Sequence, residues 1–479
     1  MALTKRQVYL YGAGASAIGR GAELVAAFAT MWLLTHMLPR EDYGYYVVAF
    51  TLIELIGLVA AGGMESVVVY RSSRLDAPPG QLAGAALAGS ALARGVLASL
   101  AVAAVVALAA PALAALFDKP AMEGWIRGLA LLLPILVARS IYAAWHRGRQ
   151  RLAQSILLGQ SAPKLAAVVG LALVFALAPG RQEAIVAALV GTSLLTLVGW
   201  MASAPPGPLR LRGQLDAWDL RYGLKLMLTA LMSRGSRATE VLLLGALATG
   251  GVTALFSVGA SLASLALLPH NVLGRIFAPR LGWLYSRRQR EELRREYDQT
   301  RSLAFGAALA GAVLLAGFGE PALRLFGDYE RAEPMMLIVA AAYLTQSSLG
   351  VNSTYLVMAG YGGWSLVLNL AQLGASAVLN LLLIPHYGGV GSAAAAFGSI
   401  ALVKGATSLV VWRLDRFATQ GAELALVNGA CVALLWLAAL GAVPARQAAA
   451  ALLALLGYFL YRQRGFWIPE IGRLASRPR

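Results

Sequence analysis

The sequence predicts an all-helical integral membrane protein with about fourteen transmembrane helices, arranged as two six-helix lobes followed by two further helices. Of its 479 residues, 59% are hydrophobic and only 13% are charged, whereas soluble domains are about 45–50% apolar and about 25% charged. A chain of this length with so few charges could not cover a water-facing surface. Two further observations, the recurrence of long apolar stretches and the placement of the basic residues, define the elements.

Apolar stretches long enough to cross a membrane recur along the whole chain. A hydrocarbon core of roughly 30 Å needs about 20 apolar residues per helix. In the first half, such windows predict spans at 9–36, 43–70, 82–116, 124–145, 155–178 and 185–204. In the second half they predict spans at 222–246, 253–283, 302–326, 334–358, 365–384, 391–412, 421–442 and 448–461.

The basic residues in the links between spans predict the orientation. With the N-terminus inside, the outer links hold only Arg40, Lys119, Arg181, Arg331 and Arg446. The inner links and tails hold several times as many, as the preference of cytoplasmic loops for Lys and Arg requires. Both termini are therefore expected in the cytoplasm, and the location to be the bacterial cytoplasmic (inner) membrane with multiple passes.

The links also predict the domain organisation. A stretch with three prolines, at 205, 206 and 208, divides the chain after the sixth span. We expect an N-terminal six-helix lobe at 1–204, a cytoplasmic linker at 205–221, a C-terminal six-helix lobe at 222–412, and two extra helices with a basic tail at 413–479.

The first spans of the two halves share a short polar outer turn and an Arg-x-x-Glu motif. The halves therefore resemble paired repeats with a substrate site between them.

Several charged residues fall inside the predicted spans. Near the span ends, Arg127, Lys225, Arg280 and Arg324 are expected to extend to the membrane surface. Deeper cations would each cost at least about 2.5–3.5 kcal/mol facing lipid, so they are expected to face a water-filled cavity or a partner. These deep cations are Arg20, Arg94, Arg139, Lys164, Arg234, Arg237 and Lys404, and Arg275 is also inside a span.

Acidic partners within the spans are fewer, namely Glu23, Glu54, Glu65 and Glu240. Glu23 can pair with Arg20, and Glu240 with Arg237, at a spacing of three on one helix. The remaining cations imply an anion from outside the chain. Because Arg grips phosphate with two hydrogen bonds, a phosphate- or diphosphate-bearing substrate is expected. The predicted substrate-binding residues are Arg20, Arg94, Arg139, Arg234, Arg237, Arg275 and Lys404, and the predicted coupling or charge-balancing residues are Glu23, Glu65 and Glu240.

No enzyme motif is present. The four histidines, at 36, 146, 270 and 386, lack metal-ligand spacing, and neither a phosphate-binding loop nor a nucleophile motif occurs. We therefore expect no catalytic residues, no metal and no cofactor, although a proton or sodium gradient is a candidate energy source. We expect the net charge of +17 to set the orientation in the membrane and to bind the substrate, rather than to bind nucleic acid.

The segment LTHMLPREDYGYYVVAFTLIELIGLVAAGGMESVVVYR resembles the start of the polysaccharide (Wzx-type) flippases of the multidrug/oligosaccharidyl-lipid/polysaccharide exporter superfamily. Pro39, Glu41, Asp42, Tyr43 and Gly44 match that family's turn, while Met37-Leu38 replaces its usual Leu-Leu-Gly. MSRGSRATEVLLLG, LLPHNVLGRIFAPRLGWL, LRLFGDYERAEPMMLIVAAAYL and VLNLLLIPHYGGVGSAAAAFGSIAL are similar to later segments, so the resemblance covers most of residues 8–415.

This resemblance implies a two-lobed fold that moves a polyprenyl-diphosphate-linked oligosaccharide outward by alternating access, as in O-antigen synthesis. It also implies membrane lipids as partners, with a polysaccharide polymerase or another assembly protein as a candidate. Three alternatives stay open: a lipid II flippase of peptidoglycan synthesis, a multidrug cation exporter of the same superfamily, and a membrane glycosyltransferase or O-antigen ligase. An exporter of cations should carry unpaired carboxylates in its cavity, and the enzymes usually need a sizeable outer loop.

Overall fold

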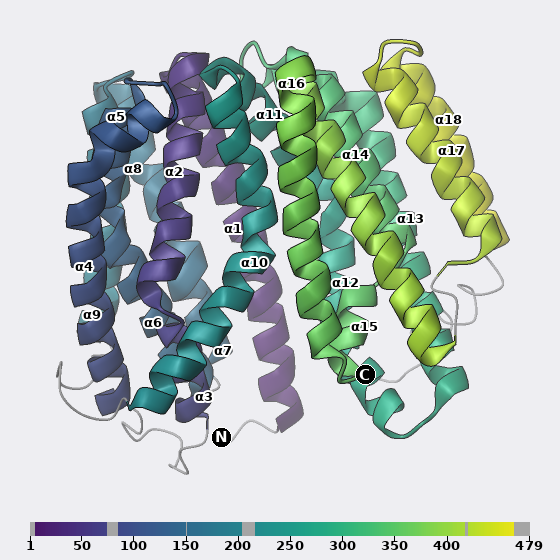
Figure 1. Ribbon diagram of the computed structural model, residues 1–479, viewed down its shortest axis with the longest axis horizontal. Helices are drawn as coiled ribbons and strands as arrows, with labels where there is room; N and C mark the ends of the chain where they lie inside the picture. Colours follow the sequence, from purple (N-terminus) through teal and green to yellow (C-terminus); the bar gives the residue numbers. More distant parts are fainter. Residues whose placement is uncertain (1–4, 74–84, 150, 204–215, 417–419, 464–479) are drawn as a thin grey trace. The chain divides into compact units, whose positions relative to one another are not determined.

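The computed structural model describes the chain except for residues 1–4, 74–84, 150, 204–215, 417–419 and 464–479 (Figure 1). The described residues form helices and connecting turns, without a strand. This confirms the all-helical prediction. The helices divide between two compact units, Met1–Ala254 and Leu255–Arg479.

Unit 1 contains the first ten α-helices. Their bounds are α1 (Lys5–Met37), α2 (Arg40–Ala61), α3 (Met64–Ser72), α4 (Ala85–Leu116), α5 (Met122–Ala130), α6 (Leu132–Gly148), α7 (Leu152–Ile156), α8 (Ala162–Leu177), α9 (Gln182–Ser203) and α10 (Ala217–Leu247). A π-helical segment, Leu157–Ser161, joins α7 to α8. The next helix, α11 (Gly250–Ala263), begins in unit 1 and continues into unit 2.

Unit 2 contains the remaining helices. Their bounds are α12 (Leu268–Ser286), α13 (Arg290–Arg324), α14 (Glu333–Ser348), α15 (Asn352–Met358), α16 (Gly362–Asp415), α17 (Ala422–Ala439) and α18 (Ala445–Arg462), with short 3-10 turns at Ser264–Leu267 and Glu330–Ala332. At 1.5 Å per residue α16 would be about 80 Å long, far more than one crossing needs. It is two helices meeting at Gly388, whose φ of 54° is outside the helical region. This break separates the spans predicted at 365–384 and 391–412.

Other predicted spans are also broken helices. α5 and α6 meet at 42°, and the helix that ends at Ser348 meets α15 at 41°. By length and composition, seven helices in the described part could cross a membrane, or nine if each bent pair is one span. The membrane class is thus supported, while the count of fourteen spans and the cytoplasmic termini stay predictions.

Unit 1 ends later in the chain than the linker predicted at 205–221, because α10 packs against α2 and α3. Glycines permit close packing at two points of unit 1, one against α10 and one against the start of α11. A Cβ at Gly63, whose φ is 72°, would clash with the backbone of Gly223, and a Cβ at Gly44 would clash with the backbone of Gly250. The predicted lobes remain a hypothesis about which helices move together.

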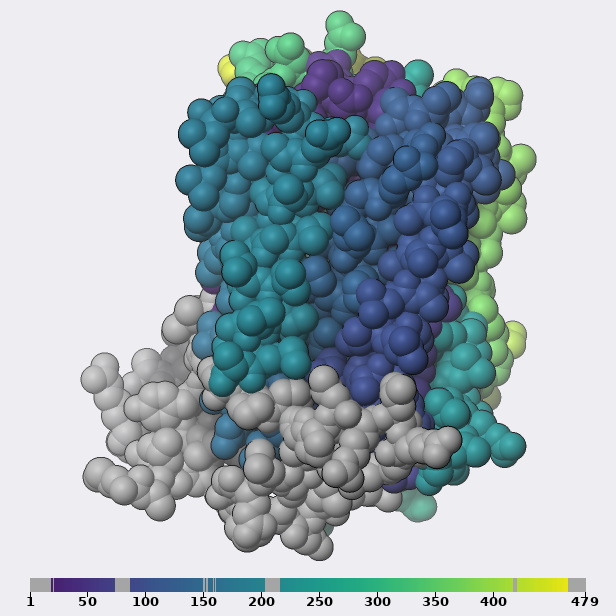
Figure 2. Space-filling model, turned by 90° about the vertical axis from the view of Figure 1, so that its left-hand side faces the viewer, coloured from purple at the N-terminus to yellow at the C-terminus, as the bar shows by residue number. Residues whose placement is uncertain are grey.

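The core of unit 1 lies between α3, α4 and α6, where Tyr142 and Trp145 are buried. The outward-facing sides of α4 and α9, which also contribute to this core, are apolar. Figure 2 shows the face of unit 1 that α4 and α9 cover, and Leu108 on α4 and Leu195 on α9 are 83% and 73% exposed. Such surfaces belong against lipid chains.

In unit 2, α14 is the central helix. Every residue from Met336 to Ala342 is buried, because α13, α16 and α17 pack around it. A helix that is apolar and buried on all sides is typical of the middle of a bundle.

Candidate functional site

Unit 1 holds a group of interacting charged residues that come from five helices. We call Glu23, Glu54, Arg139, Lys164, Arg234 and Arg237 the charge cluster. They lie on α1, α2, α6, α8 and α10. The ends of four of these helices, α1, α2, α8 and α10, meet in two pairs. Glu41 of α2 accepts a hydrogen bond from the amide of Gly251, just beyond α10, and Gly180, beyond α8, lies near the carbonyl of Met37.

The depth of the cluster follows from counting back from these ends. Glu23 and Glu54 lie about 14 residues from Met37 and Arg40, and Lys164 and Arg234 lie about 13 residues from Leu177 and Leu247. At 1.5 Å per residue this is roughly 20 Å. If these helices cross the membrane as the sequence predicts, a hydrocarbon core of about 30 Å would place the cluster near its middle.

Lys164 and Glu23 of the charge cluster form a direct ion pair. The Nζ of Lys164 donates to Oε1 of Glu23 over 2.8 Å, with the two side chains 44% and 18% exposed. Lys164 follows the π-helical segment by one turn, and the Ser161 hydroxyl at the end of that segment donates to the carbonyl of Gly19 on α1 at 2.9 Å. A π-helical turn inserts a residue and changes the direction of those that follow. We infer that it helps to direct Lys164 towards α1.

Glu54 is the acidic centre of the cluster. It interacts electrostatically with Lys164, Arg234, Arg139 and Arg237, which come from α8, α10 and α6. Arg139 also interacts with Glu23. Side chains from separate helices can meet in this way only if they share one side of the bundle, so these charges face one another rather than lipid.

Along α10, Arg234, Arg237 and Glu240 recur at three-residue spacing, so they share one stripe of the helix. Glu240 interacts electrostatically with Arg237, as the sequence suggested. Arg234 and Arg237 are exposed, and so is Glu54. The charge cluster is therefore open enough for a charged ligand to reach the guanidinium groups.

With Glu240 included, four cations of the cluster face three carboxylates. With every one of these side chains ionised, the described cluster has a formal charge of +1, which is a smaller excess than the sequence implied. Guanidinium groups on neighbouring helices can bind a phosphate or diphosphate through paired hydrogen bonds.

Two of these residues were not among the predicted binding or coupling residues: Glu54 and Lys164. The sequence showed both inside spans, but it did not show that Glu54 faces cations from three other helices. A signal was nevertheless present, because Glu23 and Glu54 are equally far from the turn that joins their helices, about 14 residues on either side.

Arg94 and Glu65 lie outside the charge cluster. The side chain of Arg20 is outside the described residues, so its pairing with Glu23 stays a prediction. Arg94 is half-buried on α4, beside Gly95, which packs against α6. Glu65 on α3 interacts electrostatically with Arg147 at the end of α6.

In unit 2, Lys404 on α16 donates to the hydroxyl of Ser353 at 3.1 Å, and it lies within electrostatic range of the buried His270. Arg275 on α12 is exposed. The predicted binding roles of these residues stay predictions.

Cations near helix ends behave differently from the deep ones. Arg127 pairs with Glu123 at 2.7 Å, Arg280 pairs with Glu292 at 2.8 Å, and Arg324 pairs with Glu320. The pairs are one helical turn apart or join neighbouring helices, and the arginines are half exposed or more. They are therefore typical surface ion pairs. Within the described residues, no group of three His, Cys, Asp or Glu side chains is placed to hold a metal ion.

A family model described as "Polysaccharide biosynthesis protein" matches residues 33–326, which is more than half of the chain and includes most of the charge cluster. The chain belongs to this family. No curated protein sequence matches it. The membership agrees with the resemblance seen in the sequence.

Solved structures show the same fold. The lipid II flippase MurJ in an inward closed conformation has a TM-score of 0.70 at 12% identity, over 95% of this chain and 99% of that one. An inward-facing multidrug resistance MATE family transporter of the MOP superfamily has a TM-score of 0.63 at 16% identity, over 82% and 96%. A MOP superfamily transporter from Pyrococcus furiosus, reported with a binding pocket of reverse polarity, has a TM-score of 0.58 at 15% identity, over 87% and 98%. The polysaccharide biosynthesis family member described here therefore has the MOP superfamily fold.

Proposed function

We propose that the protein is a flippase that moves a polyprenyl-diphosphate-linked oligosaccharide from the cytoplasmic to the outer leaflet of a bacterial inner membrane, for cell-surface polysaccharide such as O-antigen. It would work by alternating access and would be a transporter, not an enzyme. The observation that carries the proposal is the open charge cluster of unit 1, which has a formal excess of cation and three arginines.

The charge of this cluster favours a diphosphate as the group that is bound. Arg139, Arg234 and Arg237 come from two helices, so they can hold phosphate oxygens from different sides. Each arginine keeps its charge when it is desolvated. A lipid-linked diphosphate also fits a polysaccharide biosynthesis family. The sugars of glycan precursors that are attached to a membrane lipid must be moved across the bilayer.

The alternatives differ in cargo. The fold of the lipid II flippase MurJ is similar, and lipid II also presents a diphosphate, so this cargo is the second candidate. A cation exporter is less well supported, because four cations oppose three carboxylates in the cluster.

A proton or sodium gradient could drive the cycle, with Glu23, Glu65 and Glu240 as candidate coupling residues. Glu54 is a further candidate because of its position among the cations.

The proposal can be tested in proteoliposomes that contain the purified protein and a fluorescent polyprenyl-diphosphate oligosaccharide. Loss of a charged hydrogen-bond partner costs about 1.5–3 kcal/mol, which corresponds to roughly 10–150-fold in binding. We expect Arg139→Ala and Arg237→Ala to slow transport by about that factor. The matched control is Arg127→Ala, which removes an exposed arginine of the same unit and should leave transport unchanged.

The same assay separates the candidates. Transport of lipid II but not of the oligosaccharide lipid would select the second candidate, and transport of a cationic dye would select an exporter. If the Arg139→Ala, Arg237→Ala double variant moved the oligosaccharide lipid at the normal rate, the charge cluster would not be the binding site.

A further inference from the structure

A cavity of about 240 Å³ opens at one end of unit 2. α13 lines it with Ala316, Gly317, Glu320 and Pro321, α14 with Glu333, and the start of α18 with Pro444, Ala445 and Arg446. Its floor is the close packing of α13 and α18, because a Cβ at Gly317 would lie 3.6 Å from that of Ala449, one turn further along α18. We call it the α13–α18 cavity.

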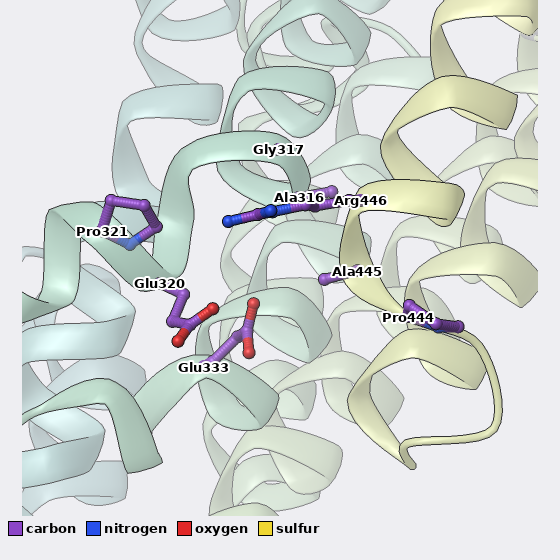
Figure 3. A pocket seen from close by; sticks show the side chains of 8 residues that line it. All are labelled: Ala316, Gly317, Glu320, Pro321, Glu333, Pro444, Ala445 and Arg446. Atoms are coloured by element: carbon purple, nitrogen blue, oxygen red, sulfur yellow. The ribbon is translucent and has the colours of Figure 1, made fainter.

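The cavity holds charges of both signs. Figure 3 shows the Glu320 and Glu333 carboxylates turned towards each other, while the Arg446 side chain extends from α18 towards α13. Glu320 pairs with Arg324, one turn along α13. Glu333 interacts repulsively with Glu320, so a further cation placed between the two carboxylates would be favourable.

The opposite wall suits an anion. Ala445 and Arg446 are in the first turn of α18, which has 18 residues. The first amide groups of a helix have no intrahelical acceptor and favour negative groups. Together with the Arg446 guanidinium, they offer donors to a phosphate.

The position of the cavity selects the class of ligand. Glu333 is the first residue of α14, Arg446 is the second of α18, and Glu320 lies four residues before the end of α13. Helix ends of a membrane protein lie at the level of lipid headgroups. The volume is below the roughly 300–1,000 Å³ of pockets that hold drug-sized molecules, so a headgroup fits and an oligosaccharide does not. Exposed apolar side chains of α13, such as Phe318 at 67% exposure, would lie beside the acyl chains.

We propose that the α13–α18 cavity binds the headgroup of a zwitterionic phospholipid with a primary ammonium group, phosphatidylethanolamine in type. Glu320 and Glu333 accept hydrogen bonds from the ammonium, and Arg446 with the first turn of α18 binds the phosphate. This site does not depend on the transported cargo. It gives the helix pair α17–α18 a lipid contact of defined chemistry.

The test compares lipids that differ in one group. The purified full-length protein is delipidated and incubated with phosphatidylethanolamine, phosphatidylcholine or phosphatidylglycerol, and retained lipid is counted by native mass spectrometry. Phosphatidylethanolamine should be retained at least fivefold better than phosphatidylcholine, whose quaternary ammonium has no N–H to donate. It should also exceed phosphatidylglycerol, which has no cation.

Two variants address the two halves of the site. Glu333→Gln and Arg446→Gln should each reduce the retained phosphatidylethanolamine at least fivefold. The matched control is Glu423→Gln, because Glu423 pairs with Arg462 between α17 and α18 at their other ends. It should retain the lipid as the parent protein does.

The outcomes decide the proposal. Equal retention of phosphatidylethanolamine and phosphatidylcholine would overturn it, because the carboxylates would then not recognise the ammonium. Preference for phosphatidylglycerol that is unaffected by Glu333→Gln would also overturn it, in favour of a simple anion site. If Glu333→Gln does not fold, the exposed Arg446→Gln variant decides alone, and normal retention by that variant would count against the site.

Discussion

At the residue scale, the charge cluster shows how acidic and basic side chains on neighbouring helices can be brought within range of one another. A single Arg facing lipid would cost at least about 2.5–3.5 kcal/mol, but here each arginine lies within range of a carboxylate. Glu54 is central, since it interacts with four cations from three helices. The formal positive charge is small, so the proposed binding of a diphosphate would depend on donor geometry as well as on net charge.

The first prediction therefore separates geometry from charge at Arg237. If the guanidinium grips a diphosphate with two parallel hydrogen bonds, Arg237→Lys should keep the charge but lose one contact. We expect about a tenfold or greater loss of transport in proteoliposomes, close to that of Arg237→Ala. Transport near the parent rate would mean that Arg237 contributes only its charge. The exchange Arg237→Glu with Glu240→Arg is a control that keeps a local ion pair but moves the cation by one turn, and it should be inactive.

At the element scale, the sequence predicted helices well and their breaks poorly. Apolar length indicated a helix in each predicted range, but hydropathy carries no information on the bend between α5 and α6 or on the π-helical turn before Lys164. The sequence also did not show that Glu54 faces the cations of α6, α8 and α10, because this depends on how each helix is rotated about its axis in the bundle. Glycine positions gave a partial signal: Gly44 and Gly250 both follow the short turns that the two halves share.

A second prediction concerns that glycine contact. Adding a methyl group at Gly44 would place it against the carbonyl of Gly250, so α2 and the start of α11 would have to separate. Overpacking of this kind costs about 1–3 kcal/mol. We expect Gly44→Ala to lower the Tm of the purified protein, whereas Gly199→Ala on α9, where a Cβ meets nothing within 4 Å, should not. An unchanged Tm for Gly44→Ala would show that this contact is loose.

A third prediction concerns the start of α10, where Asp216 and Asp219 form a capping box and Arg71 of α3 pairs with both. The hydrogen bond from the Asp219 backbone amide, together with Arg71, holds the pKa of Asp216 below its usual value of 3.8. A lowered folded pKa means that the ionised cap stabilises the folded state above pH 3.8, and that this stabilisation is lost as pH falls through the folded pKa. Hydrogen exchange of the first turn of α10 should therefore become faster relative to the rest of the helix on acidification. In Asp216→Asn, which cannot ionise, this change should be much smaller.

At the scale of the whole molecule, the charges outside the membrane carry the information on orientation. The few basic residues of one set of links and the many of the other predict cytoplasmic termini, and this preference is strongest for short loops. Composition and link charge need no knowledge of packing, which is why they could be read from the sequence. The same asymmetry predicts that the α13–α18 cavity lies at the outer end of unit 2, because Arg331 and Arg446 belong to the predicted outer links.

The last prediction tests this orientation with single cysteines in a Cys431→Ala background. Cys431 is buried, so its replacement removes background labelling with little change to the surface. Pro39 and Ala442 are exposed in turns of unit 1 and unit 2 that are predicted to be outside, and Gln289 is exposed in a turn predicted to be inside. In intact cells an impermeant thiol reagent should label Pro39→Cys and Ala442→Cys but not Gln289→Cys. In permeabilised cells it should label all three.

Labelling of Gln289→Cys alone in intact cells would show that the topology is the reverse of the predicted one, and that the proposed direction of transport is reversed with it. Labelling of Pro39→Cys but not of Ala442→Cys would instead place the two sites on opposite sides of the membrane. The chain would then cross the membrane an odd number of times between them.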